Sequence, residues 1–319
     1  MAALASYEAQ SGFGRRIWPG ELMDRSPKRA PPTVSVIVPH YHDLPGLQLC
    51  LNALARQTYP DPFEIVVADN ASPEGVDAVT QVAAGRAMVV TVPDRGAGPT
   101  RNGGVAASSG DLLAFTDSDC VPDPDWLQQG LAALAQADFV GGRMQVLVED
   151  PARPRPAEAF EAVFAFDNRR YVEEMGFTVT ANLFCPRAVF DAVGGFGVGM
   201  SEDLEWCRRA GAAGFKLAYA PLAVVGHPAR RTWPELRTKW RRLNAETYAL
   251  TAGEPGGALR WFLRSLLLPF SAVAHTPKVL SSPALSSWGQ RFGAIGALYR
   301  LRLWRFADAL GLLVSGGRK

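Results

Sequence analysis

Two aspartates one position apart, Asp117 and Asp119, directly follow an apolar run at residues 113–115. Carboxylates this close repel each other and lose hydration when buried, so at a strand end they need either water or a cation. A solvated, proline-punctuated turn is one interpretation, because short aspartate clusters are common in turns. The other is a divalent-metal site that neutralises a phosphate-bearing ligand. The pair alone leaves both interpretations open.

The elements around this pair alternate between strand and helix. β-branched and apolar runs predict the strands, and apolar residues at helical spacing predict the helices between them. The predicted strands cover residues 33–39, 63–69, 87–92 and 111–119, and the predicted helices cover a segment from Leu44 to Leu54, 75–84 and 98–108. This alternation is typical of an α/β fold with a mostly parallel central sheet.

Ligands of such sheets bind beyond the carboxyl ends of the strands. Pro39, Asp69 and the pair Asp117 and Asp119 all fall at these ends. Three polar strand ends that meet in one crevice are less expected by chance than one aspartate pair. Their convergence therefore favours the metal interpretation.

The pattern is less regular after residue 137. We predict a strand at 138–148, one helix at 156–172, a strand at 178–186, a helix from Ser201 onward, a short strand at 216–221 and three basic helical segments after Trp233. Ser201 is a suitable N-cap, and Glu202 and Asp203 in the first turn suit the helix dipole. We divide the chain into an N-terminal extension (1–30), a sheet domain (31–228) and a helical segment (229–319).

The composition is that of a globular protein, with 48% hydrophobic and 20% charged residues in a chain of 319. The net charge of +2 hides an asymmetry. From Pro228 onward there are fifteen Lys and Arg against four acidic residues, which leaves eighteen basic and 27 acidic residues before it. A basic helical segment therefore follows an acidic body.

Four separated cysteines without a C-x-x-C pair indicate a reduced, cytoplasmic setting. The N-terminus has no basic start followed by an apolar run, so we predict no signal peptide. The most apolar stretch, 259–275, is interrupted by Arg264 and Pro269 and falls short of the roughly 20 apolar residues that span a bilayer. It is expected to lie on a membrane at most, on the cytoplasmic face.

The motifs SVIVPHYHD, VVADNAS, GPTRNGGV, FTDSD, TANLFCPRAVFDAVGGF, SEDLEWCRRAGAAGFKLAYAP and GH follow in this order. In order and spacing, over about residues 33–227, they resemble the inverting glycosyltransferases of family 2, of the bacterial polysaccharide-assembly type. The resemblance implies a GT-A fold, which is Rossmann-like, with a nucleotide-sugar donor and Mn²⁺ or Mg²⁺ as cofactor.

The resemblance also implies residue roles. The implied donor-binding residues are Pro39, Tyr41, Asp69, Asn70, Arg101, Asn102, Asp117 and Ser118. The implied metal ligands are Asp117, Asp119 and His227. Asp203 resembles the general base, and Asn182, Glu202 and Trp206 are the implied acceptor contacts. Several of these residues have a structural alternative: Asp69 as a strand-end turn residue, Glu202 and Asp203 as helix-dipole acids, His227 as a loop histidine and Trp206 as a core residue.

The chemistry of sugar transfer requires such groups whatever the family. A departing diphosphate needs a hard cation and helix-end donors, and the attacking hydroxyl needs a base on the opposite face of the sugar. The resemblance, together with this chemistry, implies metal-dependent, inverting transfer from a UDP-sugar to a hydroxyl of a glycan or lipid-linked glycan, in polysaccharide biosynthesis. A polyprenyl-phosphate glycosyltransferase and a catalytically silent nucleotide- or carbohydrate-binding member of an assembly complex are the alternatives.

The helical segment interleaves arginines with aromatic residues. Arg237, Arg241 and Arg242 alternate with Trp233 and Trp240, and the pattern continues toward the C-terminus. Basic helices rich in Trp and Leu fit an interfacial segment on an anionic membrane. Packing against the sheet domain would explain the apolar residues equally well. No nucleic-acid module accompanies the charge, so nucleic acid is not an expected partner.

Overall fold

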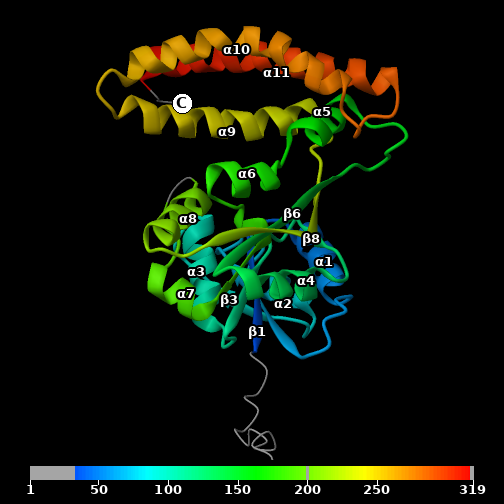
Figure 1. Ribbon diagram of the computed structural model, residues 1–319, viewed down its shortest axis with the longest axis vertical. Coiled ribbons are helices and arrows are strands. Elements are labelled where there is room, and N and C mark those ends of the chain that lie inside the picture. Colours follow the sequence, from blue (N-terminus) through cyan, green and yellow to red (C-terminus); the bar gives the residue numbers. More distant parts are fainter. Residues whose placement is uncertain (1–32, 199–200, 317–319) are drawn as a thin grey trace, which may run out of the picture. The chain divides into compact units, whose positions relative to one another are not determined.

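The computed structural model describes residues 33–198 and 201–316, and the predicted extension 1–30 lies outside them (Figure 1). Strands and helices alternate in the first part of the described chain, as predicted. In chain order they are β1 (Val34–His40), α1 (Leu44–Leu54), β2 (Phe63–Asp69), α2 (Val76–Ala83), β3 (Met88–Thr91), α3 (Ala97–Ala107) and β4 (Leu112–Phe115). β4 is shorter than expected and ends before Thr116, so Asp117 and Asp119 lie in the turn that follows it.

The later elements complete the sheet and form the C-terminal helical segment. They are β5 (Val121–Pro122), α4 (Trp126–Ala133), η1 (Leu134–Gln136), β6 (Phe139–Leu147), α5 (Pro156–Phe164), α6 (Asn168–Met175), η2 (Thr180–Asn182), β7 (Leu183–Pro186), α7 (Arg187–Val193), α8 (Glu202–Ala212), β8 (Leu217–Pro228), α9 (Trp233–Ala252), α10 (Gly257–Leu280) and α11 (Trp288–Ser315).

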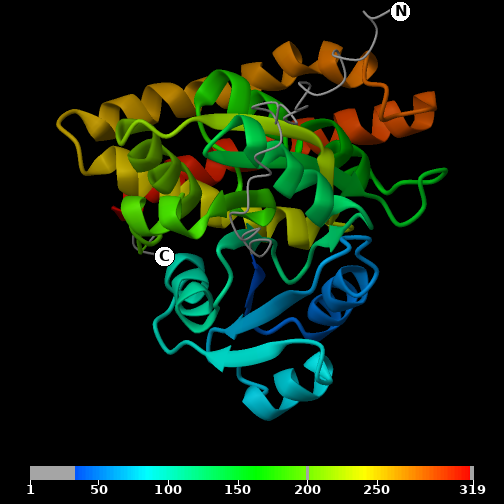
Figure 2. The same cartoon turned by 60° about the horizontal axis from the view of Figure 1, so that its bottom comes forward.

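The strands form one eight-stranded sheet in the order β3-β2-β1-β4-β7-β6-β8-β5. β3, β2, β1 and β4 are parallel, β7 runs antiparallel to β4 and β6, and β8 is parallel to β6. The predicted α/β class is confirmed, with a mixed second half of the sheet. Figure 2 shows the parallel part in blue to cyan.

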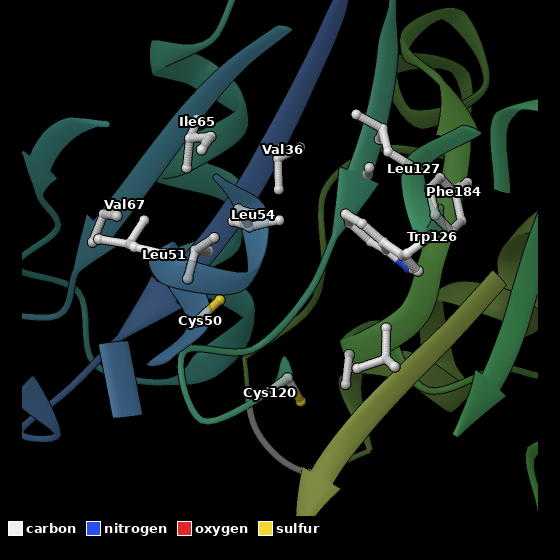
Figure 3. Close-up of a cluster of buried hydrophobic side chains, with 14 of the residues drawn as sticks. Val36, Cys50, Leu51, Leu54, Ile65, Val67, Cys120, Trp126, Leu127 and Phe184 are labelled. Atoms are coloured by element: carbon white, nitrogen blue, oxygen red, sulfur yellow. The ribbon is translucent and has the colours of Figure 1, made fainter. Parts of the chain in front are cut away.

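Alternating side chains of the strands supply two cores, one on each face of the sheet. Val36 points to the face covered by α1 and α4, where Leu51 and Trp126 are buried (Figure 3). Its neighbour Ile37 points to the other face, where Phe115 packs under α8. This two-sided burial fixes the register of β1, because a slip of one residue would exchange the two faces.

The helix predicted at 156–172 is wrong as one element, because it breaks between α5 and α6. Phe166 has φ 54°, in the left-handed region that interrupts a helix. The buried Asn168 amide donates to the Gly142 carbonyl and to Thr178 Oγ1, and accepts from the Val179 amide. These contacts hold the second helix, α6, against the sheet in a direction that one continuous helix would not take.

Two predicted strands also have different bounds. Residues 180–182 form the short 3₁₀ turn η2, so β7 begins only at Leu183. The predicted short strand at 216–221 is part of the longer β8, which continues to Pro228 and pairs His227 with Val146 of β6. His227 is therefore a strand residue, with its position set by the sheet.

The three C-terminal helices are present as predicted, and they share a core with α5. Phe160 of α5 is buried with Leu236 of α9 and with Leu298 and Leu301 of α11. Figure 1 shows α9, α10 and α11 side by side, with α5 next to them. No helix within the described ranges is both long and apolar enough to cross a membrane.

Candidate active site

A cavity of about 390 Å³ opens at the carboxyl ends of β1, β2 and β4, next to the start of α3. Its walls bring together six of the eight residues predicted to bind a nucleotide donor. The lining residues are Pro39, His40, Tyr41, Asp43, Asn70, Gly96, Ala97, Thr100, Arg101, Asp117, Ser118 and Asp119. Tyr41, at 58% exposure, presents an aromatic ring at the rim of this cavity.

Asp69, one of the two predicted donor contacts outside the lining, is only 1% exposed. Its carboxylate accepts from Ser72 Oγ at 2.5 Å and the Ser72 amide at 3.1 Å, and from His40 Nδ1 at 2.9 Å. His40 Nε2 accepts from the Asp43 amide at 3.3 Å, which leaves the proton on Nδ1. Asp69 therefore lies behind His40 and orients that ring, so the predicted contact with the nucleotide donor is not open in this arrangement.

Two asparagines hold the loops around the cavity. The Asn70 amide donates to the carbonyls of Val92 and Asp94, and its oxygen accepts from the Gly96 amide. Asn102 bonds both the carbonyl and the amide of Phe196, each at 2.8 Å. Asn102 thus fixes the loop after α7, and its side-chain amide is not available for the predicted contact with the donor.

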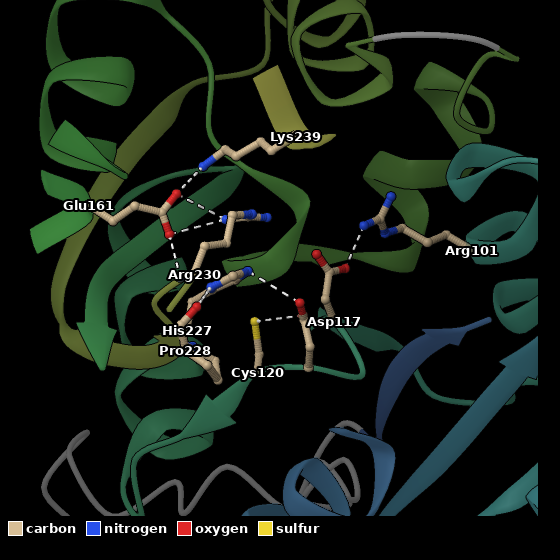
Figure 4. Close-up of polar contacts among 9 residues, drawn as sticks. Arg101, Asp117, Cys120, Glu161, His227, Pro228, Arg230 and Lys239 are labelled. Atoms are coloured by element: carbon tan, nitrogen blue, oxygen red, sulfur yellow. Dashed lines mark hydrogen bonds and ion pairs between the residues drawn. The ribbon is translucent and has the colours of Figure 1, made fainter. Parts of the chain in front are cut away.

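Arg101 of α3 is a buried cation between two carboxylates. Its guanidinium contacts Asp117 Oδ1 at 2.5 Å and Glu202 Oε1 at 2.7 Å, and its side chain is 4% exposed (Figure 4 shows the Asp117 contact). Burial alone would lower the pKa of Arg101, but the two carboxylates raise it above its ordinary value. Glu202, which was predicted to bind the acceptor, is instead ion-paired with Arg101.

Asp203 follows Glu202 at the start of α8 and has a different environment. One carboxylate oxygen accepts from the Leu204 amide at 2.7 Å. Burial, and next the charge of Glu202, raise the pKa of Asp203 to about 6. Arg101 and Asp117 also act on this pKa, so Asp203 is electrostatically coupled to the cavity. A carboxylate with a raised pKa that is ionised at neutral pH is suited to take a proton.

Asp119 and His227 meet at the other edge of the cavity, with His227 Nε2 3.3 Å from Asp119 Oδ2. Burial alone would raise the pKa of Asp119. The hydrogen bond and the charge of His227 outweigh this effect and hold the pKa below its ordinary value. Nδ1 of His227 faces the Pro228 carbonyl at 2.8 Å, which leaves Nε2 directed at the carboxylate.

A carboxylate oxygen and an imidazole nitrogen suit a divalent cation in donor chemistry, but in this arrangement the two side chains bond each other. The third predicted ligand does not join them, because Asp117 is turned toward Arg101. Within residues 33–198 and 201–316 no group of three or more His, Cys, Asp or Glu side chains is arranged around a metal position. Of the three predicted ligands, only Asp119 and His227 contact each other.

Two predicted acceptor residues are instead structural. Trp206 has no exposed surface, packs edge-on against Phe139 and donates Nε1 to the Gly194 carbonyl at 2.9 Å. Asn182 is also fully buried, and its amide is used by Trp126 Nε1 and the Ala223 carbonyl. A sugar cannot stack on a side chain without accessible surface, so the core interpretation of Trp206 is correct.

One cluster was missed from the sequence. Glu161 of α5, with a side chain only 2% exposed, contacts Arg230 Nη1 at 3.2 Å and Lys239 Nζ at 2.8 Å (Figure 4). Arg230 and Lys239 line a second cavity of about 750 Å³ that shares Asp119 with the first. The run HPARR marked Arg230 as basic, but its partner lies 69 residues earlier in the chain.

A family model described as Glycosyl transferase family 2 matches residues 35–205, which is more than half of the chain. The chain therefore belongs to glycosyl transferase family 2, and it is a glycosyltransferase. Among curated proteins it is 32% identical to Glycosyltransferase AglE of Haloferax volcanii, over 66% of this chain and 71% of that protein. It is 28% identical to the Pre-mycofactocin glycosyltransferase of Mycobacterium tuberculosis, over 63% of this chain but only 44% of that protein.

The solved structures confirm the GT-A fold. The mannosyltransferase PcManGT from Pyrobaculum calidifontis, in complex with GDP-Man and Mn²⁺, matches with a TM-score of 0.55 and 20% identity over 91% of each chain. S. aureus TarS 1-349, in complex with UDP-GlcNAc, matches with a TM-score of 0.50 and 16% identity over 86% of this chain and 92% of that chain. At these identities the likeness concerns the fold alone.

Proposed function

We propose that this glycosyltransferase is metal-dependent and inverting, and that it moves a sugar from a nucleotide donor, a UDP-sugar, to a hydroxyl of a glycan or lipid-linked glycan in polysaccharide biosynthesis. The observation that carries the proposal is the position of Asp203. Its pKa is raised to about 6, and it lies one residue from Glu202, which is ion-paired through Arg101 to the strand-end cavity.

The donor is proposed to bind in the 390 Å³ cavity, with its base beside Tyr41 and the wall formed by Pro39 and His40. The diphosphate would lie between the start of α3 and the pair Asp119 and His227. Helix N-termini favour anions, and Arg101 offsets the negative charge of Asp117 at this position. The likeness to structures solved with GDP-Man and UDP-GlcNAc agrees with a nucleotide-sugar donor.

Mn²⁺ or Mg²⁺, held by Asp119 and His227, would neutralise the charge that develops on the departing diphosphate. Asp203 would accept the proton of the acceptor hydroxyl as its oxygen forms a bond to the anomeric carbon. In the same step the bond between that carbon and the diphosphate oxygen breaks. A single displacement with one base inverts the configuration at the anomeric carbon.

Asp203→Asn tests this role, because the amide keeps the shape of the side chain but cannot take a proton. We expect transfer to fall by about a hundredfold or more, the usual contribution of a general base, with unchanged nucleotide affinity. Glu205→Gln, which changes an exposed acid on the same helix, is the matched control and should retain activity.

The assay screens UDP- and GDP-sugars by release of the nucleoside diphosphate and assigns the product anomer by NMR. Unchanged turnover in Asp203→Asn would contradict the assignment of the base and would favour a phosphate acceptor, which needs little base catalysis. An active wild type whose product retains the donor configuration would exclude the single displacement.

A further inference from the structure

The outward side of α10 carries a continuous apolar face. Large apolar side chains recur along it at the three- and four-residue spacing of one helix face. They are Leu259, Phe262, Leu263, Leu266, Leu267, Phe270, Val273 and Leu280, with exposures from 38% to 73%. We call these eight residues the α10 face. Contiguous exposed apolar surface of this kind marks an interaction site in most folded proteins.

The opposite side of α10 already has its partners. Trp261 and Val279 are buried, and Trp261 Nε1 donates to the Ala309 carbonyl of α11 at 3.0 Å. Helix α10 packs on α11 and α9 through this inner side (Figure 1). Helix α10 is therefore apolar on two sides. Its inner side packs on the neighbouring helices, and the described chain leaves the α10 face uncovered.

Positive charge borders the α10 face, and no acidic residue occurs between Gly257 and Leu280. At 100° per residue, Arg260 and Lys278 project in the same direction, and Arg264 lies 40° away from them. These three cations therefore flank one edge of the apolar stripe, although Arg260 also pairs with Glu254 at 2.6 Å and Lys278 lies over the ring of Phe164 at 5.4 Å.

We propose that the α10 face docks on an anionic lipid bilayer, with the helix lying in the membrane plane. A helix that is apolar outward and cationic along its border fits the boundary between acyl chains and anionic headgroups. A second copy of this chain is a less suitable occupant, because two such faces would bring cations together without acidic partners from α10. The proposal does not depend on the transfer chemistry proposed above.

Sedimentation with vesicles tests this docking. Vesicles of phosphatidylcholine with a quarter phosphatidylglycerol should bind the wild type, and pure phosphatidylcholine vesicles should bind it more weakly. Leu263→Gln combined with Leu267→Gln should weaken binding by about tenfold or more, because two leucines lose their transfer into lipid. Arg264→Gln combined with Lys278→Gln should weaken it by about fivefold per charge, and only for the anionic vesicles.

Leu49→Gln combined with Leu222→Gln is the matched control, since these leucines are 53% and 65% exposed on the sheet domain. This control should bind vesicles like the wild type. Vesicle binding that is absent in the wild type, or unchanged by the Leu263 and Leu267 pair, would overturn the proposal. A dimer in light scattering that this pair dissociates would assign the face to a second copy instead. UDP binding by each variant shows separately whether the donor site is intact.

Discussion

The sheet domain and the C-terminal helices hold their arginines in different ways. Arg101 lies among buried groups and contacts two carboxylates, Asp117 and Glu202. In the helical segment, Arg300 lies over the ring of Trp233 at 4.2 Å and Arg305 over that of Trp240 at 4.1 Å. The first arrangement fixes a charge at a cavity, whereas the second covers aromatic surface while the segment keeps its positive charge. The difference teaches that one region neutralises its buried arginine with carboxylates, whereas the other shields its arginines with aromatic rings.

Removal of the buried cation should have the largest effect on stability. Arg101→Met would leave Asp117 and Glu202 facing each other without a counter-charge. We expect a loss of about 3–5 kcal/mol in the free energy of unfolding, as for other broken buried pairs. Urea denaturation measures it. Arg95→Met, which changes an exposed arginine before α3, is the control. A loss below about 1 kcal/mol would show that water already screens the contacts of Arg101 with Asp117 and Glu202.

The raised pKa of Asp203 predicts an effect on stability of intermediate size, which depends on pH. Because its folded pKa is about 6, above the ordinary value, the stability that this group contributes is present at low pH and is lost as the pH rises through 6. Asp203→Asn should therefore be more stable than the wild type at pH 8, by about 1–2 kcal/mol, and equal to it near pH 3. Equal melting curves at pH 8 would contradict the raised pKa.

The same shift sets the pH dependence of transfer. A general base must be ionised, so kcat/KM of the wild type should rise with pH up to about 6 and then level off. The measurement is a pH profile at subsaturating acceptor. A profile that is flat from pH 5 to pH 8 would remove Asp203 from the proton transfer.

We expect the smallest effect on stability from removing one of the arginines that stack on tryptophan rings in the C-terminal helices. Arg300→Gln removes the contact with Trp233 at an exposed position, so the expected loss is about 0.5–1 kcal/mol. Thermal unfolding is the readout. A loss as large as that of Arg101→Met would show that the two regions do not differ in how they hold charge.

Local patterns predicted much of the fold because the sheet domain is built from them. The β-branched, apolar runs of β1 and β2 and the residues at their carboxyl ends are visible without tertiary information, and they located the cavity. The role of Asp203 came from the motif resemblance and stays a prediction, and Ser201, the predicted N-cap, makes no side-chain cap bond. The break at Phe166 was not predictable, because it depends on bonds from Asn168 to a strand 26 residues earlier in the chain.

The same limit explains the errors within the site. Arg101 and Glu202 are 101 residues apart, and Asn182 meets Arg143 and Ala223 only in the folded sheet. Motif position could not show that Trp206 is covered by Phe139 and Phe196. In α10, the segment LLLPF had the composition of a core, and only the packing shows that part of it faces outward.

Calorimetric binding of UDP and GDP, with and without Mn²⁺, to the wild type and to Asp119→Ala tests the central claim most directly. We predict that UDP binds the wild type only with Mn²⁺, and that Asp119→Ala weakens this binding by about tenfold or more, as for the loss of a metal ligand or its support. UDP affinity that is the same in both proteins, or the absence of binding by either nucleotide, would contradict a metal-assisted donor site at the end of β4.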